Sequence, residues 1–274
     1  MEYITKEGLK TAFSQAGIKK GDTILVHSDI SSFGIVENFT KKRQLEIFYQ
    51  AFIETLGEEG TLCVPAFFYE YARYGTPFDI QLSPVSDSLG VFSKYINSIE
   101  GRKRSCCPTT SIAALGKNAE YICEIKNRHG YGEDSAWDRM YKLNTKIVII
   151  GTENGMTFSH YVDYRVGLPY LYTKLYDTPV YDNGKLIFDF TFSSVRYLNF
   201  NIDWYTGAKK LKKELLISNG LMTKSEYLAS TVLCVSMQPL FNYYKELLYN
   251  NPYYFLKEKP KFTPGQVPFD GNVI

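Results

Sequence analysis

Residues 146–151 (KIVIIG) and 157–163 (TFSHYVD) decide the expected fold, because they predict a buried strand and, after a short turn, a helix. Thr157 stands where a helix N-cap is expected. On that helix His160 and Asp163 are three residues apart, so their side chains should point to one face. The order strand, turn, helix therefore brings an imidazole and a carboxylate to one end of a sheet strand.

This pair has two interpretations. In open α/β folds the carboxyl edge of the sheet binds ligands, and histidine is the side chain best tuned for proton transfer near neutral pH. The alternative is a structural histidine that a neighbouring aspartate holds in place. The stretch alone does not decide between them.

Composition excludes several classes of protein. The chain has 274 residues and a formal charge of +2, far from the basic excess of a nucleic-acid-binding protein. Three histidines, and five cysteines without zinc-ligand spacing, predict no metal site and reduced thiols. No apolar run approaches the length that spans a bilayer, so we expect a cytoplasmic protein without membrane or nucleic-acid partners.

Strand and helix patterns alternate through the first half of the chain. Helices are expected at 5–16 and after Thr40, and further helices near 87–97 and from 134 or 135 onward, the last carrying Trp137. Buried strands are expected at 22–27, 61–65 and 111–116. This alternation predicts a layered α/β/α fold.

The second half differs. Residues 171–194 alternate around Asp182-Asn183-Gly184, which predicts a β-hairpin extension. A basic helix is expected at 208–216, a strand at 231–235 and a last helix at 237–249, followed by an irregular tail at 257–274. With no repeat and no linker, residues 1–274 are expected to form one domain.

Three stretches could carry chemistry, and each also has a structural interpretation. The polar loop 26–34 could hold phosphate, or be a simple turn. The basic turn 102–105 could supply cations to an anionic cofactor, or face solvent, as the basic helix at 209–213 is expected to do. Cys106-Cys107 could supply a nucleophile with His160 as its base, although buried cysteines are usually inert. The long aromatic loop 67–84 is a candidate substrate wall.

Taken in order, six short motifs resemble the aminoglycoside 3-N-acetyltransferase family, whose members use acyl-CoA and differ in fold from the commoner acetyltransferase superfamily. The motifs are VHSxxSSxG at 26–34, GTLxxPxF at 60–67, SPxSxxxG at 83–90, RSxxPxxSxAAxG at 104–116, GxxS at 132–135 and GxxxxxTxxHxx-acid at 151–163. The resemblance covers roughly the first 170 residues well. It implies a three-layer α/β/α sandwich on a mixed sheet.

The resemblance also implies direct transfer of an acyl group from acetyl-CoA, or a longer acyl-CoA, to a primary amine. His160 would be the general base, and Asp163 would orient it or hold the amine. The implied coenzyme A-binding residues are His27, Ser28, Ser31, Ser32, Arg104, Ser105 and Ser111. The implied acceptor-binding residues are Phe67, Cys107, Trp137 and Thr157.

Two departures from the family pattern concern the acceptor. The family usually has Glu at Asp163 and His at Cys107. A sequence pI near 8.1 is also unlike an enzyme built for polycations. We therefore expect an amino sugar as acceptor, preferably a nucleotide-linked deoxyamino sugar for surface polysaccharide. True aminoglycoside acetylation conferring resistance is the first alternative and a non-catalytic coenzyme A-binding relative the second; a homodimer is left open.

Overall fold

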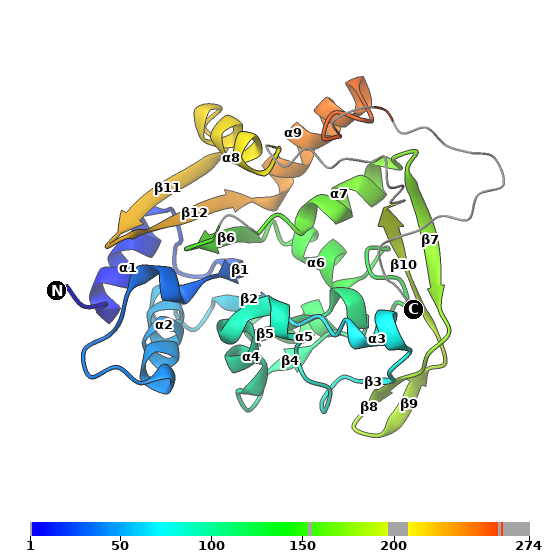
Figure 1. Cartoon of the computed structure of the whole chain (residues 1–274), viewed down its shortest axis with the longest axis horizontal. Coiled ribbons are helices and arrows are strands. Elements are labelled where there is room, and N and C mark those ends of the chain that lie inside the picture. Colours follow the sequence, from blue (N-terminus) through cyan, green and yellow to red (C-terminus); the bar gives the residue numbers. More distant parts are fainter. Residues whose placement is uncertain (1, 153–154, 197–207, 257–258, 260–274) are drawn as a thin grey trace.

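The centre of the structure is a seven-stranded mixed sheet with the strand order β11-β12-β6-β1-β2-β5-β4 (Figure 1). The computed structural model describes residues 2–152, 155–196, 208–256 and 259, with only the backbone for 208–212. The strands are β1 (Thr23–Ser28), β2 (Thr61–Pro65), β4 (Lys103–Arg104), β5 (Ile112–Gly116), β6 (Lys146–Ile150), β11 (Met222–Tyr227) and β12 (Ser230–Ser236). β1 runs parallel to both β2 and β6, and the other pairs are antiparallel. The carboxyl ends of β1, β2 and β6 therefore meet at one edge.

Helices cover both faces of this sheet, which confirms the predicted three-layer α/β/α sandwich. In β1, Ile24 and Val26 pack on one face, whereas Leu25 packs on the other. The first face carries α1 (Lys6–Gln15), α2 (Lys41–Leu56) and α4 (Gly90–Ser98). The second carries α5 (Ala119–Cys123), α6 (Ala136–Lys142), α7 (Phe158–Val166), α8 (Ala208–Ser218) and α9 (Met237–Asn250).

The predicted helix starts are confirmed where a capping side chain stands at the right place. Thr5, Thr40 and Ser135 each accept a hydrogen bond from a backbone N–H in the first turn of α1, α2 and α6. Thr157 stands at the N-cap position of α7, as predicted, but its side chain does not cap the helix. Its backbone is already helical, with φ −57° and ψ −28°, and its side chain makes no cap hydrogen bond to α7.

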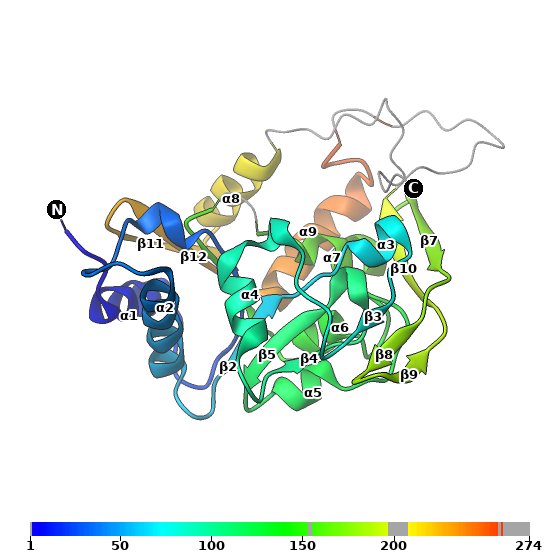
Figure 2. The same ribbon diagram turned by 60° about the horizontal axis from the view of Figure 1, so that its bottom comes forward.

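The hairpin turn predicted in the second half is confirmed, but the strands around it form two small sheets. Asn183 (φ 50°) and Gly184 (φ 80°) connect β8 (Val180–Asp182) to β9 (Lys185–Phe188), and β3 (Phe78–Asp79) adds a third strand. β7 (Leu171–Tyr176) pairs with β10 (Thr191–Arg196). Both views place these sheets at the end of the molecule away from α1 and α2 (Figures 1 and 2).

Some elements were not predicted. The aromatic loop 67–84 contains α3 (Glu70–Tyr74) and β3, and the basic turn contains β4. Single 3-10 turns stand at η1 (Ile30–Phe33), η2 (Asp87–Leu89) and η3 (Pro108–Thr110). The edge strand β11 escaped prediction because only Met222 and Ser225 of its six residues are buried. The tail predicted at 257–274 lies almost entirely outside the described residues.

Candidate active site

The loops that follow β1 and β6 are locked together at the carboxyl edge of the sheet. Asp29 N donates to Ile150 O (2.9 Å), and Gly151 has a φ of +64°. A Cβ placed on Gly151 would lie 2.0 Å from Ser32 Oγ and 2.2 Å from Asp29 O. Only glycine permits this approach, and it places the polar loop after β1 beside the segment that leads into α7.

His27 and Ser28 end β1 at this edge. His27 lies on the same face of the sheet as α7, because Leu25 two residues earlier packs there. Its Nε2 is buried and has no hydrogen-bond partner among the described residues. Burial, and then the charge of Lys213, lower the pKa of His27 to about 4, so the ring is neutral at physiological pH.

Lys213 is a cation at this edge that the sequence did not single out. Its Nζ donates to Thr152 O (3.1 Å), and the side chain is half-buried. The basic helix was expected to face solvent as a whole, and this expectation is wrong for Lys213. The side chains of the other three lysines of 209–213 lie outside the described residues.

The serines of the β1 loop have structural partners. Ser31 N and Oγ both donate to Asp29 Oδ1 (3.1 and 2.5 Å), which caps η1, and Ser31 is exposed. Ser32 Oγ donates to Asp29 O (2.8 Å) and lies 2.8 Å from Ser230 Oγ of β12. Ser31 thus faces the open side of the loop, whereas Ser32 ties the loop to the sheet.

His160 lies in the first turn of α7 and is half-buried. The ring of Tyr131 stacks beside it at a centroid distance of 6.1 Å and an interplanar angle of 27°. Tyr131 in turn contacts Trp137, which is fully buried and donates from Nε1 to Thr110 O (2.9 Å). An aromatic wall therefore stands beside the imidazole.

Phe67 and Tyr69 extend that wall from the end of β2. Their rings are 5.8 Å apart, and Phe67 lies 6.5 Å from the ring of Trp137. The aromatic loop thus joins the rings that lie beside His160, and its contact with a substrate stays a prediction. Trp137 itself is inside the core, so any effect it has on an acceptor passes through Tyr131 and Phe67.

Asp163, one turn after His160, is almost completely buried and forms an ion pair. Arg196, the last residue of β10, donates from Nε (2.8 Å) and from Nη2 to Asp163 Oδ2. The carboxylate keeps 2% of its side-chain surface exposed and the guanidinium 19%. The sequence predicted the carboxylate but gave no sign of its cation, which comes from a strand 33 positions away.

Arg104 is buried rather than presented to a ligand. Its Nη1 donates to Ser83 O (2.5 Å), and its Nη2 donates to Ala66 O (2.5 Å) and Pro84 O (3.2 Å). Burial lowers the pKa of Arg104 to about 9. This geometry favours a structural role, in which the guanidinium closes the aromatic loop, over the phosphate contact that the resemblance implied.

Ser105 and Ser111 are buried in the same region. Ser105 Oγ accepts from Ile112 N (2.9 Å), and Ser111 Oγ donates to Ala66 O (2.6 Å). Ser111 has no exposed surface. Both hydroxyls hold the chain around β5, which again favours positioning over direct contact with coenzyme A.

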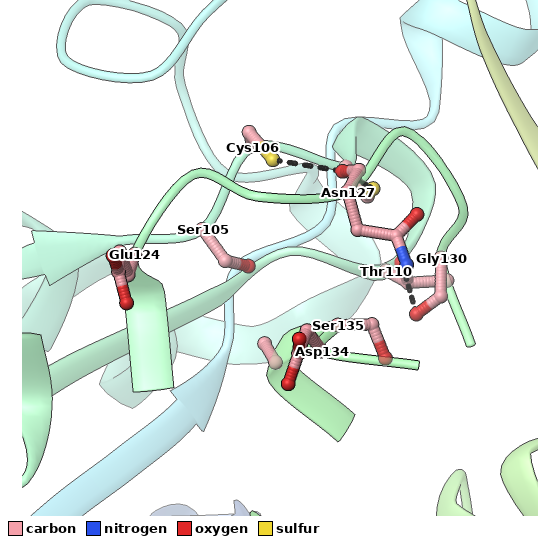
Figure 3. A pocket seen from close by; sticks show the side chains of 10 residues that line it. Ser105, Cys106, Thr110, Glu124, Asn127, Gly130, Asp134 and Ser135 are labelled. Atoms are coloured by element: carbon pink, nitrogen blue, oxygen red, sulfur yellow. Dashed lines mark hydrogen bonds between the residues drawn. The ribbon is translucent and has the colours of Figure 1, made fainter. Parts of the chain in front are cut away.

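Cys106 and Cys107 line a small cavity (Figure 3). The cavity holds about 10 Å³, room for about one water molecule, and Asn127, Asp134 and Ser135 also line it. Both thiols point to Asn127 O, at 3.4 and 3.6 Å. The neighbouring thiol of Cys106, and then burial, raise the pKa of Cys107 well above its usual value, so the structure gives no support to Cys107 as a nucleophile. Contact of Cys107 with an acceptor stays a prediction.

His129 holds the aromatic wall and was missed from the sequence. Its Nδ1 accepts a hydrogen bond from Tyr131 N (3.0 Å), and its ring lies 4.6 Å from Tyr164 and 5.2 Å from Phe192. Burial lowers the pKa of His129 to about 4. The neutral ring thereby fixes the backbone of the residue that stacks on His160.

Comparison with known proteins gives this geometry its context. The model of the family described as aminoglycoside 3-N-acetyltransferase matches residues 25–249. This is most of the chain. The chain belongs to the aminoglycoside 3-N-acetyltransferase family. It is therefore an enzyme of the N-acetyltransferase class.

Individual members of the family are distant in sequence. An SPbeta prophage-derived aminoglycoside N(3')-acetyltransferase-like protein, YokD of Bacillus subtilis, is 27% identical over 207 residues, covering 67% of this chain and 72% of the relative. The solved AAC-IIIb binary complex with CoASH has a TM-score of 0.75 at 19% identity and covers 94% of this chain and 100% of its own. A histidine-to-alanine mutant of AAC(3)-IVa in complex with a gentamicin has a TM-score of 0.76 at 21% identity, with 94% and 93% covered. These structures share the fold of this family member.

Neither a metal cluster nor a membrane-spanning helix is found in the part of the chain that the structure describes. No group of three or more His, Cys, Asp or Glu side chains in the described ranges could hold a metal ion. In the same ranges no helix is both long and apolar enough to cross a bilayer.

Proposed function

We propose that this enzyme transfers the acetyl group of acetyl-CoA to a primary amine of an aminoglycoside-type acceptor, with His160 as the general base. The observation that carries the proposal is the position of His160, half-buried in the first turn of α7 after the carboxyl end of β6 and stacked against Tyr131. Members of the family supply the acceptor class, because several relatives are named aminoglycoside N(3)-acetyltransferases and one solved relative binds a gentamicin.

The carboxyl edge of the sheet beside β1 has features that suit the binding of the acyl donor, acetyl-CoA. Coenzyme A is a polyanion, and Lys213 places a cation there. The first residue of α4, Gly90, lies close to Ser28, since a Cβ on Gly90 would be 3.6 Å from Ser28 O. The buried Nε2 of His27, which has no hydrogen-bond partner in the described part of the chain, is a polar atom that a bound ligand could satisfy. We propose His27, Ser28, Ser31 and Lys213 as the donor-binding residues, with Ser32, Arg104, Ser105 and Ser111 holding the loops around them.

The reaction then needs one substitution and the removal of two protons from the acceptor nitrogen. An acceptor amine is protonated at neutral pH and cannot attack a thioester until it loses a proton, which His160 accepts and passes to solvent. As the amine nitrogen bonds to the acetyl carbon, His160 accepts the second proton, the carbon–sulfur bond breaks, and the departing thiolate takes that proton from the imidazolium. Positioned proton transfer of this kind contributes roughly 10²–10⁴-fold to rate. Tyr131 and Phe67 are proposed to exclude water from the imidazole.

A nucleotide-linked deoxyamino sugar is the second candidate acceptor. Two observations favour it: the slightly basic charge of the chain, with a sequence pI near 8.1, and the ion pair that compensates Asp163. A carboxylate already paired with Arg196 is a weaker anchor for a polycation than an unpaired one.

Thiol release tests the proposal directly. The purified enzyme is incubated with acetyl-CoA, or with longer acyl-CoAs, and with gentamicin-type amines or nucleotide-linked amino sugars. Acceptor-dependent release with gentamicin-type amines confirms the first candidate, and release only with nucleotide sugars replaces it by the second. If no amine stimulates release above the rate of acetyl-CoA hydrolysis alone, the proposed function is wrong.

A further inference from the structure

We propose that Cys106 and Cys107 form an oxidation site, at which hydrogen peroxide joins the two adjacent thiols in a disulfide and thereby slows the enzyme. The site is the small cavity that both residues line (Figure 3). The oxidation itself does not depend on the proposed acetyl transfer at His160. Its effect on the rate rests on that proposed function.

The two thiols lie on the same side of the chain. Adjacent side chains of an extended strand point in opposite directions. Here the chain bends at Cys106, and both sulfurs lie close to Asn127 O, Cys106 Sγ at 3.4 Å and Cys107 Sγ at 3.6 Å. The backbone thus directs both sulfurs toward one atom, as a bond between them requires.

Cys106 is the thiol of this pair that ionises more easily. A hydrogen bond from the Cys107 thiol is the largest cause that lowers the pKa of Cys106; burial opposes it, and the charge of Arg139 assists it. Burial raises the pKa of the three other thiols of the chain, which are those of Cys63, Cys123 and Cys234. Because the thiolate is the form that reacts with peroxide, oxidation should start at Cys106.

The size of the cavity selects the oxidant. The cavity has a volume of about 10 Å³, and Cys106 and Cys107 keep only 5% and 8% of their surface exposed. Hydrogen peroxide is one oxygen atom larger than the single water that such a volume holds, and it carries no charge. Oxidised glutathione is a charged peptide disulfide far larger than the cavity. We therefore expect peroxide to react here and oxidised glutathione not to.

The chemistry is a two-electron oxidation. The Cys106 thiolate attacks one peroxide oxygen, the oxygen–oxygen bond breaks, and the leaving hydroxide takes up a proton, which yields a sulfenic acid and water. The Cys107 sulfur then bonds to the Cys106 sulfur, and the sulfenic hydroxyl leaves with the Cys107 proton as a second water. The dithiol loses two electrons, and peroxide gains them.

The resulting disulfide should be easy to reduce. Cα atoms of adjacent residues are about 3.8 Å apart, which is less than the roughly 4.4–6.8 Å usual for a disulfide. A disulfide under such strain is reduced more readily than a relaxed one. The modification is therefore reversible by a small thiol.

Oxidation reaches the active site through the loop that carries Tyr131. A disulfide has no S–H group, so Asn127 O loses both of its thiol donors. The Asn127 side chain accepts a hydrogen bond from His129 N (2.6 Å), and His129 Nδ1 accepts one from Tyr131 N (3.0 Å). The ring of Tyr131 stacks beside His160. Direct contacts thus connect the two thiols to the proposed base.

Mass spectrometry of the wild-type enzyme tests the site without any substrate. Trypsin cleaves after Arg104 and Lys117, so both thiols fall in peptide 105–117, which has no other cysteine. We expect this peptide to lose two hydrogens on treatment with hydrogen peroxide and to regain them with dithiothreitol. The inference is overturned if the peptide stays reduced, only gains oxygen, becomes linked to Cys123, or takes up glutathione from oxidised glutathione.

Rates of acetylated product formation from a gentamicin-type amine test the effect on catalysis. After peroxide treatment the wild-type rate should fall by roughly fivefold or more and recover with dithiothreitol. Cys106→Ser keeps a hydroxyl donor for Asn127 O but cannot form the disulfide, so peroxide should change its rate by less than about twofold.

Cys123→Ser is the matched control for these rates. It removes another buried thiol, whose Sγ donates to Ile112 O (3.6 Å), and it should respond to peroxide as the wild type does. A Cys106→Ser variant as sensitive as the wild type, or a wild type that forms the disulfide without losing rate, overturns the inference.

Hydrogen exchange separates this inference from the proposed function. Oxidation should speed amide exchange in residues 127–131, a readout that needs neither coenzyme A nor an acceptor. If no amine is acetylated but the disulfide forms and exchange becomes faster, only the proposed function is wrong. Unchanged exchange in the oxidised wild type contradicts the inference, and this measurement stands even if Cys106→Ser fails to fold.

Discussion

His129 is the residue at which protonation should couple most directly to the shape of the site. Its folded-state pKa of about 4 lies below the 6.5 of an unperturbed histidine. Between these values the unfolded chain binds more protons, so stability is complete above about pH 6.5 and is lost as pH falls toward 4. At about 1.36 kcal/mol per pKa unit the loss from this residue is at most about 3 kcal/mol. His27 titrates in the same direction and adds to it.

His129→Asn is expected to flatten this dependence. The asparagine Oδ1 can accept the hydrogen bond of Tyr131 N but does not titrate. We predict a lower unfolding free energy at pH 7, because ring contacts to Tyr164 and Phe192 are lost, and a smaller decrease between pH 6.5 and 4. Urea unfolding at several pH values measures both. A slope equal to that of the wild type would contradict the neutral, buried state of His129.

At the residue scale, the sequence was most informative where the relevant partners are close in the chain. His160 and Asp163 share a helix face through local geometry alone, and the structure shows it. Arg196 and Arg104 could not be interpreted in this way. Their partners come from tertiary contacts, of β10 with α7 and of β4 with the carbonyls of residues 66, 83 and 84, so neither the ion pair of Arg196 nor the burial of Arg104 was visible in the sequence.

At the scale of elements, the contact between the two edge loops depends on one glycine. We predict that Gly151→Ala lowers the unfolding free energy by about 2–4 kcal/mol more than Gly167→Ala. Both glycines have positive φ (64° and 74°), so both substitutions strain the backbone, but nothing lies within 4 Å of a Cβ at Gly167. Equal losses in denaturant unfolding would show that the approach to Asp29 and Ser32 is not tight.

The aromatic loop depends in the same way on Arg104. We predict that Arg104→Lys lowers the unfolding free energy by about 2–4 kcal/mol, since the compact ammonium lacks the two separated nitrogens through which the guanidinium bridges three carbonyls. The affinity of the folded variant for coenzyme A should stay within about threefold of the wild type. Denaturant unfolding measures the stability of the variant, and calorimetry measures its affinity for coenzyme A. Normal stability with coenzyme A binding weakened about tenfold or more would restore the direct phosphate contact.

The type of an element was predictable where the local pattern was clear, as in the capped, periodic helices α1 and α2 and in the apolar strands β2 and β6. The prediction failed where an element depends on its neighbours. The hairpin turn at 182–184 is local chemistry, but the division of its strands between two sheets depends on β3, which pairs with Val180 and Tyr181 from a distant part of the chain. The polar strand β11 is likewise defined only by pairing with β12.

At the scale of the whole molecule, six weak motifs in order predicted the family and the three-layer sandwich, and both are confirmed. Successive side chains of β1 and β2 pack alternately into two hydrophobic cores, so each of these apolar strands must be covered by helices on both faces. This is why apolar strands alternating with helices predict three layers. The chemical class of the acceptor could not be predicted from the sequence as the family and the fold could. The residues around His160 come from distant parts of the chain, as Tyr131, Asp163 and Arg196 do, and their arrangement is not visible in the sequence.

The central claim is that His160 acts on the acceptor's proton and not on donor binding. His160→Ala separates the two: pre-steady-state turnover with acetyl-CoA and the best acceptor is measured beside the coenzyme A dissociation constant. We predict a fall in turnover of about 10²–10⁴-fold with a dissociation constant within about threefold of the wild type. Turnover close to that of the wild type would remove His160 from the mechanism, and lost coenzyme A binding would place it at the donor instead.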